Sequence, residues 1–203
     1  MNLNTVVIVG DRFDPAMFSP EEFFGGAVDA DRIVVGPMAQ FSYNSRRCGF
    51  ALNPSRIDLL EHSAAIMPEE LQSTAQQVVR SLEKIRPAVE INGFGFNCDT
   101  TFETASRTGD EICNSLAQMP LLEEIAANSE LQGLTQFKYT RGELVYSVRI
   151  EPEVQSQGKN LYVAVNGHQA VAEADKLEMK LKHSLDFRQY VGGLHERIRS
   201  TLL

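Results

Sequence analysis

The segment that decides the fold runs from Cys48 to Asp99 and has at its centre Pro68-Glu-Glu-Leu-Gln-Ser-Thr-Ala-Gln-Gln-Val-Val-Arg-Ser-Leu-Glu-Lys-Ile-Arg-Pro87. Apolar side chains recur there at alternating four- and three-residue steps, at Leu71, Ala75, Val78, Leu82 and Ile85. This spacing puts them on one face of an α-helix, and such a face must be buried. Pro68 suits the first helical turn and Pro87 prevents continuation, so the sequence predicts a long central helix between them.

The stretches on either side of this helix have the alternating apolar pattern of strands, but each pattern changes phase once. The change falls at Asn53-Pro54 before the helix and at Gly93 after it. A strand that swaps faces at a glycine indicates a β-bulge, with a positive φ expected at that glycine. Two strands bent near their middles predict a strongly curved sheet.

The remaining N-terminal and middle parts of the chain carry signals for further strands and helices. An apolar strand is expected at residues 5–9 and an antiparallel meander through residues 32–44. The capping-box spacings Ser19-Pro-Glu-Glu22 and Thr108-Gly-Asp-Glu111 each predict the start of a helix. Another short helix is expected at residues 121–127.

The C-terminal part predicts a hairpin over residues 134–151, a strand that ends at Asn166-Gly167, and a helix that starts at Ser184. The pair Gly192-Gly193 weakens that helix, which suggests that another backbone approaches closely there. The expected class is α+β, a curved and mostly antiparallel sheet with a long central helix, a helical insert and a C-terminal helix packed on one face. One domain of residues 1–203 is expected, with two intimately packed halves, 1–105 and 106–203, as the alternative.

Composition indicates a soluble globular protein that folds without disulfides or metals, since the chain has 203 residues, 43% hydrophobic and 23% charged. The three cysteines, Cys48, Cys98 and Cys113, have no C-x-x-C spacing, which favours reduced thiols in an intracellular protein. The sequence shows neither a targeting pattern at its start nor an apolar run of membrane-spanning length. We therefore expect a cytoplasmic protein without a membrane partner.

The net charge of −8 argues against a broad nucleic-acid surface. The charge is uneven, because residues 176–203 carry six Lys and Arg side chains against three Asp and Glu. A solvated helix face explains this excess more readily than a nucleic-acid site does. Nucleic acid is therefore the least favoured of the partners considered.

Motifs for catalysis, metal binding or nucleotide binding do not stand above background. Gly10-Asp-Arg-Phe-Asp-Pro15 follows a strand, but with one glycine and no Walker lysine it favours a turn, and Asp11 and Asp14 are too few ligands for a divalent cation. Glu178-Met-Lys180 resembles half of a nuclease E-x-K site, yet it lies in a charged helical segment. His168, expected on a short loop after a strand, is the outside candidate for a catalytic base, although no nucleophile is marked. No cofactor or metal is expected.

Aromatic side chains lie on the predicted strands or at their ends, at Phe94, Phe96, Phe102, Tyr139, Tyr146 and Tyr162. They could line a ligand groove or a nucleic-acid stacking surface. Lys and Arg do not alternate with them along those strands, so a role in the core is the favoured interpretation.

Four stretches resemble a sporadically distributed bacterial family to which no activity is assigned. They are Phe50-Ala-Leu-Asn-Pro-Ser-Arg-Ile-Asp-Leu59, Val89-Glu-Ile-Asn-Gly93, Leu161-Tyr-Val-Ala-Val165 and Leu194-His-Glu196. The resemblance implies the same order of elements over most of the chain and a hint of mobile or defence-associated genes. The chain departs from the family at Ile91-Asn-Gly-Phe94, where the family has an arginine-rich Gly-Leu-Arg-Tyr-like run.

Two functional hypotheses follow. The first is a non-catalytic module that binds another protein, or a second copy, through a sheet edge or the C-terminal helix. The helix combines an apolar stripe with a charge opposite to that of the remaining chain, and its candidate contact residues are Arg188, His195, Arg197 and Arg199. The alternative is a small-molecule-binding protein or weakly marked hydrolase, with a sheet-lined pocket near His168.

Overall fold

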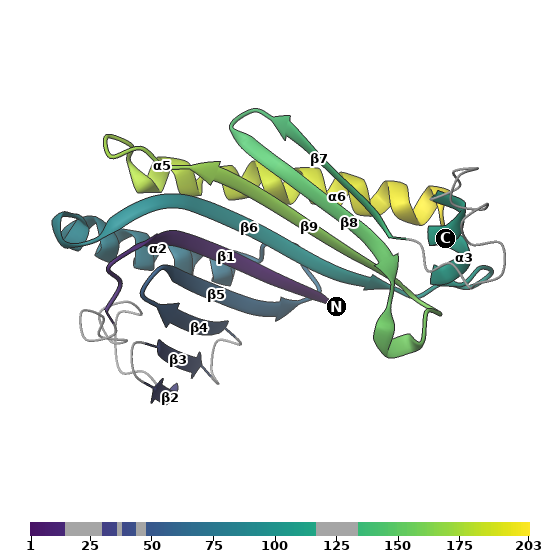
Figure 1. Ribbon diagram of the computed structural model, residues 1–203, viewed down its shortest axis with the longest axis horizontal. Helices are drawn as coiled ribbons and strands as arrows, with labels where there is room; N and C mark the ends of the chain where they lie inside the picture. The colour runs from purple at the N-terminus through teal and green to yellow at the C-terminus, as the bar shows by residue number, and fades with distance from the viewer. Residues whose placement is uncertain (15–29, 36–37, 44–47, 117–133) are drawn as a thin grey trace, which may run out of the picture.

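The computed structural model describes residues 1–203 apart from 15–29, 36–37, 44–47 and 117–133 (Figure 1). In the described part, nine strands form one antiparallel sheet in the order β2-β3-β4-β5-β1-β6-β9-β8-β7. The strands are β1 (Asn2–Asp11), β2 (Ala30–Val35), β3 (Met38–Tyr43), β4 (Cys48–Asn53), β5 (Arg56–Ser63), β6 (Glu90–Phe102), β7 (Thr135–Arg141), β8 (Leu144–Pro152) and β9 (Leu161–Ala170). The helices are α2 (Glu69–Ile85), α3 (Gly109–Leu116), α5 (Leu177–Leu181) and α6 (His183–Thr201). The predicted α+β class is confirmed, and the helices expected at Ser19 and at 121–127 lie outside the described residues.

The two long helices, α2 and α6, cover one face of the curved sheet (Figure 1). As predicted, α2 begins directly after Pro68, and a single 3₁₀ turn that contains Pro87 follows it. Four residues of the predicted stripe are buried, Leu71, Ala75, Val78 and Leu82, together with Thr74 and Val79, whereas Ile85 is half-buried. The core therefore lies between this helical layer and the sheet.

The order of elements repeats within the chain. The first half consists of β1, the meander β2 to β5 and then α2, and the second consists of β6, α3, the meander β7 to β9 and then α5 and α6. The strands that open the halves, β1 and β6, are neighbours at the middle of the sheet, so each meander extends outward from there. In this repeat of elements the second half starts at Glu90.

One rung of the sheet, on the face that carries the helices, shows why this repeat is not visible in the sequence. Its paired residues are Phe50, Leu59 and Val6 in the first half and Phe96, Gly167 and Tyr146 in the second. Leu59 and Gly167 occupy corresponding positions in the two halves. The side chain of Leu59 fills the space above its strand, whereas at Gly167 that space is taken by the ring of Phe187 on α6, which would lie 2.7 Å from a Cβ. The halves therefore reach similar packing with different residues.

The stretch from Cys48 to Ser63 is a hairpin, so the prediction of one strand bent at Asn53-Pro54 is wrong. β4 and β5 pair with each other from Cys48 opposite Glu61 to Asn53 opposite Arg56. The change of phase comes from the two-residue turn between them, and the apolar residues of both strands face the same side of the sheet.

The predicted bulge beside Gly93 is confirmed. The register between β1 and β6 shifts between Val9 and Gly10, which leaves Asn92 as the extra residue. Gly93 does not have the expected positive φ. Glycine leaves room there, because a Cβ would lie 2.9 Å from Cε1 of His168 and 3.0 Å from the carbonyl oxygen of Gln169.

Two further local predictions are confirmed. At the start of α3, the backbone N–H of Thr108 donates to Oε2 of Glu111 at 2.7 Å, and the N–H of Glu111 donates to Oγ1 of Thr108 at 3.2 Å. This is the reciprocal pair of a capping box. The hairpin of β7 and β8 turns at Gly142, whose φ is 62°.

The C-terminal part departs from prediction at both of its glycine sites. β9 does not end at Asn166-Gly167 but continues to Ala170, because Gly167 makes room for a ring instead of forming a turn. A Cβ at Gly192 or at Gly193 would meet nothing within 4 Å, so the expected close approach of a second backbone is wrong. Within the described ranges, no helix has both the length and the apolarity needed to cross a membrane.

Candidate functional site

A groove of about 560 Å³ lies between the turn of the β7–β8 hairpin and the exposed side of α6. We call it the hairpin groove. Its sheet side is formed by Arg141, Gly142, Glu143, Leu144 and Tyr146, and its helix side by His183, Asp186, Gln189, Tyr190, Gly193, Leu194 and Arg197. The helix residues recur at three- and four-residue steps, which puts them on one stripe beside the buried stripe of α6.

Buried aromatic rings form the floor of the hairpin groove. Tyr146 is fully buried and stacks on Tyr139 at 5.4 Å and on Phe187 at 6.1 Å between ring centroids. Tyr190 lies 4.6 Å from Tyr146 and 5.9 Å from Tyr139. Burial raises the pKa values of Tyr139 and Tyr146, which keeps their hydroxyl groups neutral. Tyr139 and Tyr146 therefore add no charge to the groove.

Two arginines on opposite sides of the hairpin groove have no carboxylate partner among the described residues. The guanidinium of Arg141, at the end of β7, lies 5.6 Å from the ring centroid of Tyr190. Arg197 stands on α6 and is exposed. Guanidinium groups bind carboxylates through paired hydrogen bonds, so this arrangement can accept an acidic group.

The acidic residues of the groove are already paired. Nζ of Lys180 lies 2.8 Å from Oε2 of Glu143, and Nε2 of His183 lies 3.6 Å from the same oxygen. Nδ1 of His183 lies 3.1 Å from Oδ2 of Asp186. Lys180 lowers the pKa of Glu143 and so keeps that carboxylate ionised. Glu143 is therefore paired with Lys180, and Asp186 with the ring of His183, while neither acid forms an ion pair with Arg141 or Arg197 among the described residues.

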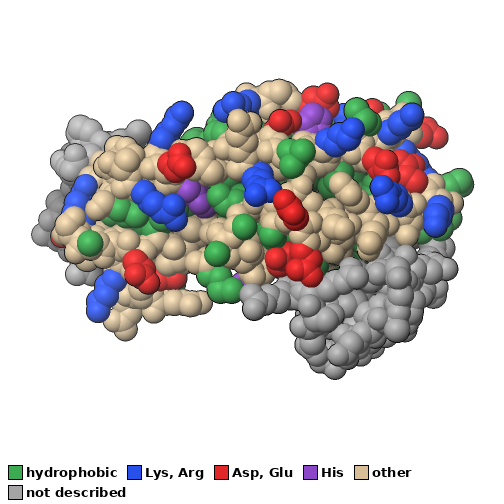
Figure 2. Space-filling view, turned by 180° about the vertical axis from the view of Figure 1, so that it is seen from behind, with side chains coloured by type: hydrophobic (Ala, Val, Ile, Leu, Met, Phe, Trp, Pro, Cys, Tyr) green, Lys and Arg blue, Asp and Glu red, His purple; other side chains and the backbone are tan. Residues whose placement is uncertain are grey.

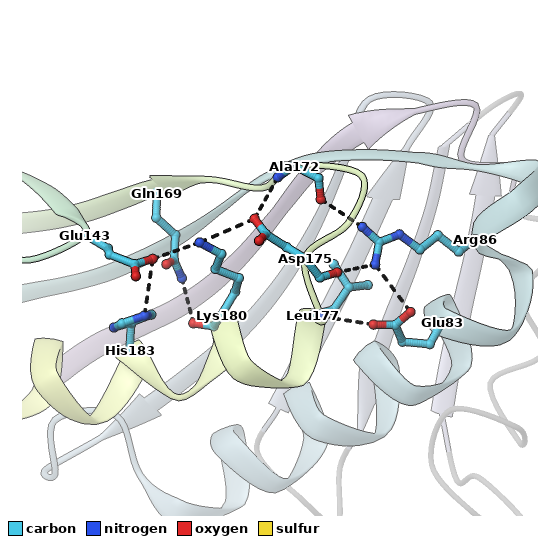
Figure 3. Close-up of polar contacts among 9 residues, drawn as sticks. All are labelled: Glu83, Arg86, Glu143, Gln169, Ala172, Asp175, Leu177, Lys180 and His183. Carbon is cyan, nitrogen blue, oxygen red and sulfur yellow. Dashed lines mark hydrogen bonds and ion pairs between the residues drawn. The ribbon is translucent and has the colours of Figure 1, made fainter.

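A polar cluster next to the groove ties its helix side to the rest of the fold (Figure 3). Lys180 lies between Glu143 and Asp175, and its backbone carbonyl accepts a hydrogen bond of 2.6 Å from Nε2 of Gln169 on β9. Asp175 also accepts from the N–H of Ala172 at 2.8 Å. These contacts hold the start of the α5–α6 segment against the sheet.

The same cluster reaches α2. Arg86, just after that helix, donates to the carbonyl oxygens of Ala172, at 3.0 Å, and of Asp175. Glu83 accepts from the N–H of Leu177 at 2.9 Å. Both halves of the chain therefore position the hairpin groove.

The other face of the sheet carries a row of hydroxyl and amide side chains across its central strands, at Thr5, Asn97, Asn166 and Ser147. Asn166 donates to Asn97. On the same face Arg149 pairs with Glu151 at 3.2 Å and lies 5.7 Å from the ring of Tyr162. Burial raises the pKa of Tyr162 to about 12. Asn97, Asn166 and Arg149 are thus already engaged with neighbouring side chains, which makes this face a weaker candidate than the hairpin groove.

His168 lies within β9 and not on a loop, so the loop prediction is wrong. Its ring lies over Gly93, and its cross-strand neighbours are Gly95 and Val145. No ion pair with a carboxylate is formed by His168 among the residues that the structure describes. His168 is also outside the hairpin groove.

The four residues of α6 that were expected to contact a partner have different surroundings in the structure. Arg197 lines the hairpin groove, whereas Arg188 is exposed outside it. His195 is buried with its ring edge-on to Phe102 at 5.1 Å, and so does not present itself to a partner. Arg199 lies over the same Phe102 ring at 5.3 Å.

Burial of His195 predicts a dependence of stability on pH. Desolvation, and then the charge of Arg199, lower its pKa from 6.5 to about 4. Between pH 6.5 and about pH 4, His195 is protonated in the unfolded chain but not in the folded chain. The free energy of unfolding therefore has its full value above pH 6.5 and falls as the pH drops towards 4. The expected loss is at least about 1 kcal/mol.

Urea unfolding at a series of pH values tests this expectation, with His195→Phe as the variant that lacks the titrating ring. The variant should lose much of the slope in this pH range, because it lacks the ring whose pKa is lowered by burial. Equal slopes in the two proteins would show that His195 does not cause the effect.

The motifs considered for metal binding are occupied by structural contacts. Glu178 pairs with Arg80 at 2.8 Å, whereas Lys180 pairs with Glu143, so the E-x-K residues point to different partners. Gly10 and Asp11, which were expected in a turn, are the last two residues of β1, and the N–H of Gly10 donates to the carbonyl of Ser55 at 3.0 Å. The described ranges contain no group of three or more His, Cys, Asp and Glu side chains placed to hold a metal ion.

Sequence reasoning missed most of the hairpin groove. The sequence predicts the hairpin that carries Arg141 and nominates Arg197, but it does not mark Arg141, Asp186 or Tyr190 as site residues. A signal was present, since His183, Asp186, Tyr190, Gly193 and Arg197 form a polar stripe at helical spacing. Nothing in that spacing says that the stripe faces a hairpin.

The face that carries the helices shows Lys, Arg, Asp and Glu side chains interspersed (Figure 2). No large area of one sign is seen there on the described residues. Such a surface lacks the broad positive field that favours nucleic acid.

Comparisons with known proteins add little. No family model matches the chain, and no curated protein matches it. One similar solved structure is Methanococcus jannaschii TBP, which is 13% identical, with 94% of this chain and 97% of that chain covered and a TM-score of 0.28. A likeness this distant carries no functional argument, and the family resemblance stays a prediction.

Proposed function

We propose that this protein is a non-catalytic, cytoplasmic interaction module that binds an acidic segment of a partner protein in the hairpin groove. The observation that carries the proposal is the pair Arg141 and Arg197. These two guanidinium groups face one groove from opposite sides without a carboxylate partner among the described residues. An acidic ligand supplies the missing charge and gains paired hydrogen bonds.

The length of the hairpin groove favours a chain segment over a small metabolite. Its helix side extends from His183 to Arg197, which is about 21 Å along a helix. A segment of several residues fits that length. A small acidic metabolite is the second candidate, because a cavity of about 560 Å³ is also within the ordinary size of a small-molecule site.

The test measures the fluorescence anisotropy of a labelled glutamate octapeptide with the wild-type protein and with Arg141→Glu/Arg197→Glu. The double variant should bind more than about tenfold more weakly, since each lost charged hydrogen bond is worth about 1.5 kcal/mol or more. The difference should grow at low salt, where charges are less screened.

Arg188→Glu is the matched control, because Arg188 is an exposed arginine of the same helix outside the groove. It should leave binding nearly unchanged, and a lysine octapeptide should not bind. Equal losses in Arg188→Glu and in the double variant would contradict a groove-specific site. Glutarate that binds as tightly as the octapeptide would favour the metabolite.

A further inference from the structure

The strand β7 is the last strand of the sheet, beside the hairpin groove. It pairs with β8 along one edge, and its other edge has no strand partner among the described residues. Most of its residues are exposed, and the ring of Phe137 on it is 41% exposed. The outward N–H and C=O groups of such an edge are a template for another extended segment.

Positive charge lies along this edge. Lys138 stands at the middle of β7 and Arg141 at its end, and neither has an ion pair among the residues described. Alternation puts Lys138 on the face opposite the helices, and Phe137 and Arg141 on the side of the groove. A strand that pairs here with acidic residues can therefore reach both basic side chains.

Lys138 also argues against a second copy of this chain as the occupant. Lys138 is the central residue of β7, so antiparallel self-pairing about the middle of the strand would put Lys138 opposite Lys138. Like charges directly opposite each other destabilise a strand pair. An acidic partner reverses this repulsion into attraction.

We propose that the acidic partner segment binds by adding a strand to the free edge of β7, with carboxylates opposite Lys138 and reaching Arg141 at the mouth of the hairpin groove. This inference rests on the proposed function and specifies how the partner is recognised. Backbone hydrogen bonds supply a part of the affinity that does not depend on partner side chains.

The test uses a labelled octapeptide, Val-Val-Glu-Val-Glu-Glu-Val-Glu, which carries two glutamates on each face of an extended strand. Two further versions of it are N-methylated either on every odd-numbered residue or on every even-numbered residue. An added strand pairs through alternate residues only. One methylated version should therefore bind at least about tenfold more weakly than the parent, since several hydrogen bonds of about 1 kcal/mol are lost, and the other should bind like the parent. Lys138→Glu should also weaken binding of the parent peptide.

The outcomes separate this inference from the proposed function. Strand addition is overturned if both methylated peptides bind like the parent, or if both lose affinity equally. The reason is that the edge of β7 can form hydrogen bonds with only one of the two alternating sets of peptide residues. In either case a loss of binding in Arg141→Glu/Arg197→Glu would still support the hairpin groove. A parent peptide that binds neither the wild type nor the variants would overturn both.

Discussion

Replacing Phe187 by alanine is expected to lower the free energy of unfolding by about 4 kcal/mol. Phe187 is fully buried on α6 and is the residue that packs this helix into the second half of the sheet. Its ring stacks on Tyr146 and lies 6.0 Å from the ring of Phe96. Gly167 leaves the space that the ring occupies and has no side chain of its own to fill the cavity that alanine would create.

Urea unfolding of Phe187→Ala measures this loss, and Leu185→Ala is the control on the same helix, because Leu185 is 54% exposed. The control should change stability by less than about 1 kcal/mol. In the Phe187→Ala background, Gly167→Val should cost much less than in the wild type, because the ring that it would strike has gone. Additive losses would show that Gly167 and Phe187 do not share that space.

Replacing Gly10 by alanine is the second large expected effect, with a loss of about 3 kcal/mol or more. A Cβ at Gly10 would lie 2.0 Å from the carbonyl oxygen of Glu90 and 2.7 Å from the ring of Phe13. The first contact is with backbone at the bulge between β1 and β6, so a side-chain rotation cannot relieve it. The two central strands would have to separate locally.

Gly49→Ala is the matched control in the same sheet. The Cβ that it adds would meet Leu60 at 3.8 Å, which is ordinary van der Waals contact. Thermal unfolding of the two variants should show a clear drop for Gly10→Ala and little change for Gly49→Ala. Similar melting temperatures would mean that the strands at the bulge shift without cost.

The glycines show where sequence reasoning reached its limit. Glycine serves two different purposes in this protein. Gly142 allows the positive φ of a turn, whereas Gly93 and Gly167 leave space for a neighbouring ring because they lack a Cβ. Only a turn glycine can be recognised from the residues next to it in the sequence. Gly167 was therefore expected to end a strand, although it lies within β9 and accommodates a ring from a helix 20 residues further on.

The sequence by itself determined the elements whose causes are local. The two prolines and the apolar stripe set the limits of α2, Thr108 and Glu111 start α3, and alternation across Gly142 makes the hairpin of β7 and β8. Each of these depends on residues a few positions apart, so spacing alone identifies them.

Only the tertiary structure decided that β1 pairs with β6 and that the hairpin faces α6. Arg141 and Arg197 lie far apart in the chain and meet at one groove because both are carried there by packing of α6 on the sheet. Such contacts depend on which faces are buried together, and local spacing does not specify that choice. The candidate site therefore belongs to the fold as a whole, while the elements that build it can be predicted from the sequence.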